Sequence, residues 1–227
     1  MGQISNKINK IKNEIPDNVD ILAAAKTRTA EEIRETVESG VEVIGENYIQ
    51  ELEDRYGKLK DINEKIEWHV IGHLQSNKIN RALRLCDNIQ TIESEKKARA
   101  INKRVPKADR ESLPVLIEIN IGEEESKFGV EPDWKKIQKL ARSIDGMDYL
   151  KLKGLMTIEP YGESEEVIRP YFKKMKQFFD QLKEMELRDS NIKTLSMGIT
   201  NSYKIAIEEG STMVRLGRAI YGPRDYS

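Results

Sequence analysis

Cysteine, histidine and net charge are all scarce in this chain. Its 227 residues include one cysteine, Cys86, and two histidines. A single thiol cannot form an internal disulfide, so the disulfide framework of a small secreted protein is excluded. The 38 Lys and Arg residues almost balance the 39 Asp and Glu residues, which gives a net charge of −1. Because no overall positive field exists to neutralise phosphates along a polymer, nucleic acid is not expected as a partner.

Long apolar segments are also missing. No apolar run approaches the roughly 18 residues that a membrane span requires, and the first seven residues, MGQISNK, lack the apolar stretch of a signal peptide. Hydrophobic residues make up 38% of the chain and charged residues 34%. This composition predicts a cytoplasmic globular protein with a substantial core, a solvated surface and no membrane association.

Short apolar segments do recur, and helical patterns lie between them. The eight expected strands are residues 19–25, 41–44, 66–71, 88–92, 115–121, 150–157, 194–198 and 212–216. Regular alternation of strand and helix predicts parallel strands joined by crossover helices. Eight such units in one chain of this length favour a (β/α)8 barrel of the TIM type over an open sheet. We therefore expect a single α/β domain over residues 1–227.

Three helices have boundaries that can be read from the sequence. The segment 29–39 opens with a capping box formed by Thr29 and Glu32 and ends before Gly40. The longest helix is expected over residues 164–185. An extra amphipathic helix, about residues 4–15, precedes the first strand. We expect this helix to cover the bottom of the barrel.

Lys26 directly follows the apolar segment 21–25, ILAAA. Functional residues of such barrels lie at the carboxyl ends of the strands, so Lys26 is expected at the barrel mouth among apolar walls. Desolvation there lowers the pKa of a lysine and favours the neutral amine that bonds to a carbonyl. The alternative is a solvated lysine at a strand end, which is common in a chain with so many charges.

Polar residues also follow the second and third expected strands. Residues 45–48, GENY, either bring a carboxylate, an amide and a phenol to the same rim as Lys26 or cap a helix. Both histidines lie in or just after the third expected strand, His69 within it and His73 beyond its end. Two histidines without a nearby carboxylate make a poor ligand set, so no metal is expected. We expect His69 to pack within the strand and His73 to form hydrogen bonds at the rim.

The segments after the last two strands predict a phosphate site, because loops at this position bind phosphate in many such barrels. Hydroxyl groups of Ser196 and Thr200, backbone amides of Gly217 and Arg218, and a helix start near Asn201 are suitable donors for a phosphate dianion. A pair of ordinary capped turns is the alternative interpretation. The agreement with the barrel's usual phosphate position favours the site.

Taken together, these segments resemble the YggS/PROSC family of pyridoxal phosphate homeostasis proteins, over nearly the whole chain. The stretches that support the resemblance are residues 24–27 (AAKT), 45–51 (GENYIQE), 68–78 (WHVIGHLQSNK), 118–121 (EINI), 125–129 (ESKFG), 154–158 (GLMTI), 196–198 (SMG) and 214–222 (VRLGRAIYG). The resemblance implies a barrel similar to the amino-terminal domain of alanine racemase, with pyridoxal 5′-phosphate (PLP) as its cofactor.

The same resemblance implies roles for individual residues. Lys26 would hold PLP as a Schiff base, Arg215 would face the pyridine nitrogen, and Asn47 would be a polar neighbour. The residues implied around the phosphate are Ser196, Thr200, Gly217 and Arg218. One segment departs from the family pattern: after Met-Gly the family commonly has Met-Ser-x-Asp, where this chain has Ile-Thr-Asn-Ser at 199–202. Ser202 replaces the carboxylate, and we expect it to cap the following helix instead.

The resemblance implies a cytoplasmic, mostly monomeric protein that buffers PLP and delivers it, with PLP-dependent apo-enzymes as possible acceptors. A second reading is a small PLP-dependent racemase or a related enzyme. Racemisation needs an acid or base on each face of the substrate, and in alanine racemase the second one comes from a further domain and the partner subunit. The sequence ends soon after the eighth strand, so we expect no robust amino-acid turnover. A third reading is a different phosphorylated ligand, with Lys26 incidental.

Two further lysines lie in the family-like stretches. Lys78 and Lys127 are candidates for a second aldehyde site or for an accepting group during transfer. A solvated surface lysine is the more common role for such residues.

Overall fold

Eight parallel strands form a closed barrel in which each strand pairs with its neighbours in the sequence, and β1 pairs with β8. The structure is a computed structural model, and it describes residues 2–188 and 191–223. The strands are β1 (Asp20–Ala24), β2 (Val43–Glu46), β3 (Glu67–Val70), β4 (Asn88–Ile92), β5 (Leu113–Ile119), β6 (Leu150–Thr157), β7 (Thr194–Ile199) and β8 (Met213–Leu216). The predicted (β/α)8 barrel is confirmed.

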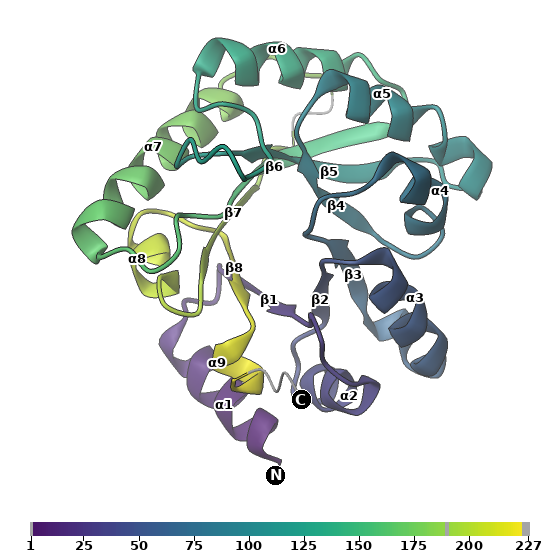
Figure 1. The fold of residues 1–227 in the computed structure, drawn as a ribbon, viewed down its shortest axis with the longest axis vertical. Helices are drawn as coiled ribbons and strands as arrows, with labels where there is room; N and C mark the ends of the chain where they lie inside the picture. The colour runs from purple at the N-terminus through teal and green to yellow at the C-terminus, as the bar shows by residue number, and fades with distance from the viewer. Residues whose placement is uncertain (1, 189–190, 224–227) are drawn as a thin grey trace.

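Helices surround the barrel and connect its strands (Figure 1). The α-helices are α1 (Gln3–Glu14), α2 (Ala30–Glu38), α3 (Ile49–Lys58), α4 (Ile79–Ala82), α5 (Glu95–Asn102), α6 (Trp134–Asp145), α7 (Glu165–Lys183), α8 (Tyr203–Glu208) and α9 (Arg218–Tyr221). Three short 3-10 helices are η1 (Asn63–Lys65), η2 (Ser76–Lys78) and η3 (Val105–Ala108). Within the described ranges, no helix has both the length and the apolar character needed to cross a bilayer.

The boundaries of most strands follow the apolar pattern, and those of β4 and β6 match it completely. The second strand differs, because it continues through Gly45 to Glu46 where the sequence predicted an end at Ile44. A Cβ atom at Gly45 would lie 2.4 Å from Leu22 Cδ2 and 2.8 Å from Ile71 Cδ1. The glycine is therefore a strand residue that makes room for apolar side chains inside the barrel, and not a turn residue.

The extra N-terminal helix does not cover the bottom of the barrel, so that expectation was wrong. Helix α1 contacts α2 and α9 on the outside of the barrel, and Figure 1 shows it beside the short α9. Its apolar stripe of Ile4, Ile8 and Ile11 is buried. Helix α9 spans only four residues and cannot by itself fill the gap between α8 and α2. The two ends of the described chain thus complete the ring of helices together.

Two kinds of core hold the barrel. The larger one lies between the strands and the outer helices and includes nearly all of the buried apolar side chains. A small cluster of Leu22, Ile71 and Met213 forms a second core. Polar side chains are also buried among the strands, including His69 and Gln90. Since buried polar groups are costly unless they form hydrogen bonds, these positions need a specific explanation.

The capping box of α2 offers a test of local helix stability. Thr29 Oγ1 accepts a hydrogen bond from the Glu32 amide at 3.2 Å, and Glu32 Oε2 accepts one from the Thr29 amide at 2.8 Å. We expect Thr29→Ala to lower the free energy of unfolding by about 1 kcal/mol, measured by urea denaturation. Ser164→Ala is the matched control, because Ser164 precedes α7 without forming a capping hydrogen bond. Equal losses in the two variants would contradict the prediction.

Candidate functional site

A cavity opens at the carboxyl ends of β7, β8 and β1. Its volume is about 580 Å³. The residues that line it are Ala24, Tyr161, Ile199, Thr200, Arg215, Gly217, Arg218 and Pro223. Four of the predicted site residues thus meet in one place: Thr200, Arg215, Gly217 and Arg218. We refer to this space as the β7–β8 cavity.

The end of β7, just before the turn at Thr200, has a backbone that favours glycine. Gly198 has φ +91°, and a Cβ atom there would lie 2.5 Å from Ala206 Cβ and 3.0 Å from Tyr203 Cα. This turn brings Thr200 to the start of α9, where Thr200 Oγ1 accepts a hydrogen bond from the Ala219 amide at 3.1 Å. The two loops that were expected to bind phosphate are therefore joined to each other.

Arg215 contributes a buried positive charge to the β7–β8 cavity. The side chain is 3% exposed, Nη1 donates to Ser196 Oγ at 2.7 Å, and Nη2 donates to the Thr157 carbonyl at 2.5 Å. Burial lowers the pKa of Arg215, while the carboxylates of Glu159 and Glu118 oppose this effect. An arginine remains charged even so, because its ordinary pKa lies far above neutrality.

Ser196 lies in a different position from the other predicted phosphate ligands. It is fully buried and is not among the residues that line the β7–β8 cavity. Its hydroxyl accepts the hydrogen bond from Arg215 and donates one to Gln90 Oε1 at 2.8 Å. The geometry thus associates Ser196 with the guanidinium, and its contact with a phosphate stays a prediction.

Lys26 lies two residues after the end of β1 and is partly buried. Its Nζ lies 5.1 Å from the centroid of the Tyr48 ring, a cation–π distance. Ala24, two residues earlier, lines the β7–β8 cavity, whereas Tyr48 lines a second cavity. The lysine thus lies at the rim between the two spaces.

The second cavity, which Tyr48 lines, has a volume of about 490 Å³. Its lining residues are Asn47, Tyr48, Ile49, Ile71, Gly72, His73, Gln75, Lys78, Glu118, Ile119, Asn120, Ser126, Lys127, Phe128 and Ile158. Asn47 is thus close to Tyr48 and the lysine but lies apart from the phosphate-type residues. Lys78 Nζ donates to Gln50 Oε1 at 3.0 Å and Lys127 Nζ donates to the Glu159 carbonyl at 3.1 Å. Their roles as secondary aldehyde sites stay predictions.

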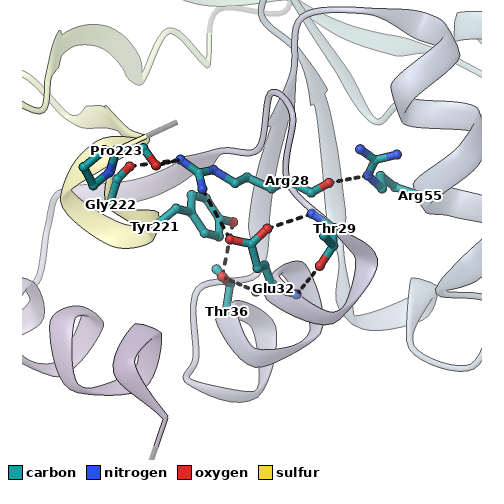
Figure 2. A network of polar contacts seen from close by, with 8 residues as sticks. All are labelled: Arg28, Thr29, Glu32, Thr36, Arg55, Tyr221, Gly222 and Pro223. Atoms are coloured by element: carbon teal, nitrogen blue, oxygen red, sulfur yellow. Dashed lines mark hydrogen bonds and ion pairs between the residues drawn. The ribbon is translucent and has the colours of Figure 1, made fainter. Parts of the chain in front are cut away.

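A network of hydrogen bonds holds the loop that follows Lys26 (Figure 2). Thr27 adopts the left-handed φ of +67°, and its amide donates to Glu51 Oε2 at 3.1 Å. Arg55 Nε donates to the Arg28 carbonyl at 2.5 Å. Arg28 Nη2 in turn donates to the carbonyls of Gly222 and Pro223, at 2.9 and 3.1 Å. The network joins the loop that follows Lys26 to the chain after α9. It thereby holds the backbone next to Lys26 in place.

Two buried carboxyl groups at the barrel mouth have raised pKa values. Burial raises the pKa of Glu46 to about 8, and the neighbouring Glu51 carboxylate adds to the rise while Arg55 opposes it. Burial likewise raises the pKa of Glu118 to about 7, aided by Glu93. Glu118 lines the second cavity, and its Oε2 forms no hydrogen bond. Carboxyl groups with pKa values near neutrality can exchange protons with a ligand.

Ser202 does not act as the helix cap that the sequence suggested. Its hydroxyl forms no capping bond to α8; it accepts from the Ile199 amide at 3.0 Å and donates to Glu159 Oε1. Glu159 is buried and favours the charged form of Arg215. Ser202 thus contacts a buried carboxylate instead of supplying one.

Sequence reasoning missed Gln90, Glu118 and Glu159. Gln90 is a polar residue within a fully buried strand, and such a residue in a parallel barrel signals a specific hydrogen-bonding role. That signal was available in the sequence. The contacts of Glu159 were not, because its partners Ser202 and Arg215 lie more than 40 residues away in the chain and meet it only in the folded barrel.

The two histidines have separate environments. His69 is buried in β3, where Nδ1 lies 2.7 Å from Gln90 Nε2 and Nε2 lies 2.8 Å from Glu67 Oε1. His73 is exposed, and its ring stacks on Phe128 at a centroid distance of 3.7 Å. Among residues 2–188 and 191–223, no three His, Cys, Asp or Glu side chains are grouped closely enough to hold a metal ion.

The closed barrel, with a cavity that contains cationic and hydroxyl side chains where β7 and β8 end, defines the class of (β/α)8-barrel proteins. Comparison with known families identifies it further. The chain belongs to the family described as alanine racemase, N-terminal domain, whose sequence model matches residues 1–225.

Curated relatives are similar along almost their entire length. The chain is 40% identical over 209 residues to the pyridoxal phosphate homeostasis protein of Pasteurella multocida, covering 92% of this chain and 88% of that protein. It is also 40% identical over 208 residues to the protein of the same name from Aquifex aeolicus, covering 91% and 87%. The resemblance noted in the sequence is thereby confirmed.

A solved structure with the same fold is that of PipY from Synechococcus elongatus. Without PLP it matches with a TM-score of 0.90 at 25% identity, covering 97% of this chain and 100% of PipY. Its form with PLP bound matches with a TM-score of 0.87 over the same shares. The backbone described above is thus close to that of both forms of this protein.

The buried carboxyl of Glu46 predicts a pH dependence of stability. The folded chain retains this proton up to about pH 8, whereas an exposed glutamate loses it near about pH 4.3. The stabilisation from the neutral carboxyl is therefore complete below the lower value and is lost as the pH rises toward the upper one. In the wild type, Glu46 should lower the free energy of unfolding by up to about 1.4 kcal/mol for each pH unit of this rise. We expect Glu46→Gln to lack this decrease, measured by urea unfolding from about pH 5 to about pH 9.

The control for this experiment is Glu186→Gln, because Glu186 is exposed. This variant should keep the pH dependence of the wild type. A Glu46→Gln variant that loses stability with rising pH as steeply as the wild type would contradict the assignment.

Proposed function

We propose that this protein binds PLP at the barrel mouth, holds it as a Schiff base on Lys26 and takes part in PLP homeostasis. The observation that supports this most directly is the convergence of Arg215, Thr200, Gly217 and Arg218 on one cavity beside the strand that leads to Lys26. The curated relatives are named for PLP homeostasis, and PipY has a structure with PLP bound.

The residues present fit a phosphorylated aromatic aldehyde. The β7–β8 cavity of about 580 Å³ lies within the roughly 300–1,000 Å³ that small-molecule sites occupy. The Thr200 hydroxyl and the exposed guanidinium of Arg218 suit a phosphate dianion, and the backbone at Gly217 permits a close approach. Tyr161, which lies 5.7 Å from the Arg218 guanidinium, supplies an aromatic wall. Ser196 completes the set indirectly, through its bond to Arg215.

PLP supplies an aldehyde carbon to which a lysine amine can bond covalently. The Lys26 side chain, aligned over Tyr48 and anchored by the Thr27 loop, provides that amine. With PLP bound, Arg215 would face the pyridine nitrogen, and Asn47 would be a polar neighbour.

We assign the protein a holding role and not an amino-acid reaction. An arginine can only donate hydrogen bonds, so Arg215 would favour an unprotonated pyridine nitrogen in bound PLP. An unprotonated ring withdraws electrons weakly and stabilises a carbanion poorly, which disfavours racemisation and decarboxylation. Two adjoining cavities at the rim also suit the entry and exit of a cofactor more than reactions that require the exclusion of water.

We propose that the protein is a cytoplasmic monomer. Its acceptors would be apo-enzymes that depend on PLP. Cys86 is a buried free thiol, which suits a reducing compartment. The exposed rings of Tyr48 and Phe128 at the second cavity leave apolar surface beside Lys26 for contact with an acceptor.

The lysine assignment predicts where the cofactor is attached. Borohydride reduction of the PLP-loaded protein should add one cofactor mass, and peptide mapping should place it on Lys26. Lys26→Ala should lose the visible absorption of the bound cofactor, because the described residues that line the β7–β8 cavity include no lysine to replace it. Lys78→Ala is the matched control, since Lys78 lines the second cavity. A reduced adduct on Lys78 or Lys127 in the wild type would refute the assignment.

A PLP-dependent enzyme is the second candidate, favoured by one observation: Glu118, with a pKa near 7, lines the second cavity beside the lysine. The two functions differ in turnover. We expect the PLP-loaded protein to racemise or decarboxylate common amino acids far more slowly than about 1 s⁻¹, measured by chiral chromatography and amine release. Turnover at or above this rate that Glu118→Gln abolishes would replace the holding role by an enzymatic one.

A further inference from the structure

A continuous chain of hydrogen bonds crosses the inside of the barrel. Arg215 Nη1 donates to Ser196 Oγ at 2.7 Å, and Ser196 Oγ donates to Gln90 Oε1 at 2.8 Å. Gln90 Nε2 lies 2.7 Å from His69 Nδ1, and His69 Nε2 lies 2.8 Å from Glu67 Oε1. Glu67 is the first residue of β3, so the chain runs from the carboxyl-terminal rim of the barrel to the amino-terminal rim.

The two ends of this chain determine its direction. Arginine has only donors and a carboxylate has only acceptors, so every member between Arg215 and Glu67 must accept from one side and donate to the other. Ser196 has one proton, which goes to the Gln90 carbonyl. The Gln90 amide nitrogen then donates to His69 Nδ1, and His69 carries its proton on Nε2, facing Glu67. The neutral Nε2–H tautomer of His69 is therefore a requirement of the whole chain.

Burial leaves these groups few alternatives. Ser196 and Gln90 are fully buried and His69 is 2% exposed. The other contact of the Gln90 amide nitrogen is Met213 Sδ at 3.3 Å, a weak acceptor. In such an interior a broken hydrogen bond is costly, and hydrogen bonds in series polarise one another.

We propose that Ser196, Gln90 and His69 are positioning residues for Arg215, and that they couple the protonation of His69 at one end of the barrel to cofactor binding at the other. The chain itself is independent of the ligand, whereas its effect on PLP rests on the proposed function. Neither the family resemblance nor the relatives' names assign a role to Gln90 or His69.

Protonation of His69 would reverse the local pattern. A proton on Nδ1 removes the acceptor for Gln90, so the amide must rotate and present its nitrogen to Ser196. Ser196 would then face two donors, Gln90 and Arg215, and its own proton would lose its acceptor. Arg215 would then share the Ser196 oxygen with Gln90, which weakens this contact, and would keep the Thr157 carbonyl unchanged. We expect a less ordered guanidinium and weaker PLP binding as the pH falls through the titration of His69.

Charged groups from several elements surround His69. Glu67 of β3 contacts it directly, Asp20 of β1 interacts with it electrostatically, and Lys193 interacts with both of these carboxylates. Burial raises the pKa of Asp20, with Glu67 adding to the rise, so this carboxyl holds its proton longer than an exposed one. Asp20, Glu67 and Lys193 all lie at the amino-terminal end of the barrel, opposite the β7–β8 cavity.

The first test requires no cofactor. The chain has two histidines, so nitrogen-15 NMR of histidine-labelled protein gives two sets of ring signals, and His73→Gln identifies those of His69. We expect the neutral Nε2–H tautomer of His69 above its titration midpoint. A proton on Nδ1 would break the direction of the chain and overturn the proposal, whether or not PLP binds.

The second test measures coupling across the barrel. Saturation with PLP should lower the His69 midpoint by about 0.7 pH unit, and the PLP dissociation constant should rise about fivefold across that titration. Gln90→Leu should abolish both effects, and Ser196→Ala, a smaller replacement, should reduce them. Thr91→Val is the matched control, because Thr91 is a buried β4 residue whose hydroxyl donates only to the Gly72 carbonyl at 3.0 Å.

The outcomes separate the two hypotheses. Coupling that is equal in wild type, Gln90→Leu and Thr91→Val would indicate a through-space effect and overturn the proposed chain. Absence of coupling in a wild type that binds PLP would overturn it as well. A wild type that binds no PLP would refute the proposed function, while the tautomer of His69 would still decide whether the chain of hydrogen bonds exists.

Discussion

Closure of the barrel by the pairing of β1 with β8 is the constraint on which the rest of the structure depends. The register aligns Leu22 with Arg215 and Ala23 with Leu216. As a result the end of β1, which leads to Lys26, lies against the turn at Gly217, where a Cβ atom would be 3.4 Å from the Ala24 carbonyl oxygen. In an open sheet the first and last strands of such an order would lie at opposite edges. Backbone hydrogen bonds of closure thus bring the lysine to the cationic cavity.

Closure also creates an interior that the protein does not fill with apolar side chains alone. A buried arginine is costly unless its donors are satisfied, and Arg215 has the Ser196 hydroxyl and the Thr157 carbonyl as partners. Glu118 and Glu159 add opposing charge nearby. The result is a guanidinium that is oriented before any ligand arrives, so less ordering is required on binding. Holding a cofactor and maintaining a polar layer in the core are therefore linked.

The lysine loop depends on contacts from both ends of the described chain. Thr27 has a backbone conformation that is unfavourable for a β-branched residue. This conformation persists because the Thr27 amide donates a hydrogen bond to the Glu51 carboxylate. Arg28 is held by Arg55 on one side and by the carbonyls after α9 on the other (Figure 2). Helix α1 packs on α9 and α2, so the extra N-terminal helix supports this same corner. A holding role requires a lysine in a defined place, and these contacts provide it.

The alternation of apolar strands and amphipathic helices, together with the capping box at Thr29, determined the barrel and the rim at which Lys26, Thr200 and Arg215 lie. Those features are local, and they could be predicted because strand and helix periods are written in neighbouring residues. The position of α1, the contact of Ser202 with Glu159 and the layer below the cavity at Ser196 could not, since each depends on partners distant in sequence. Only the tertiary structure decided them, because strand register and barrel closure determine which inward-facing side chains meet.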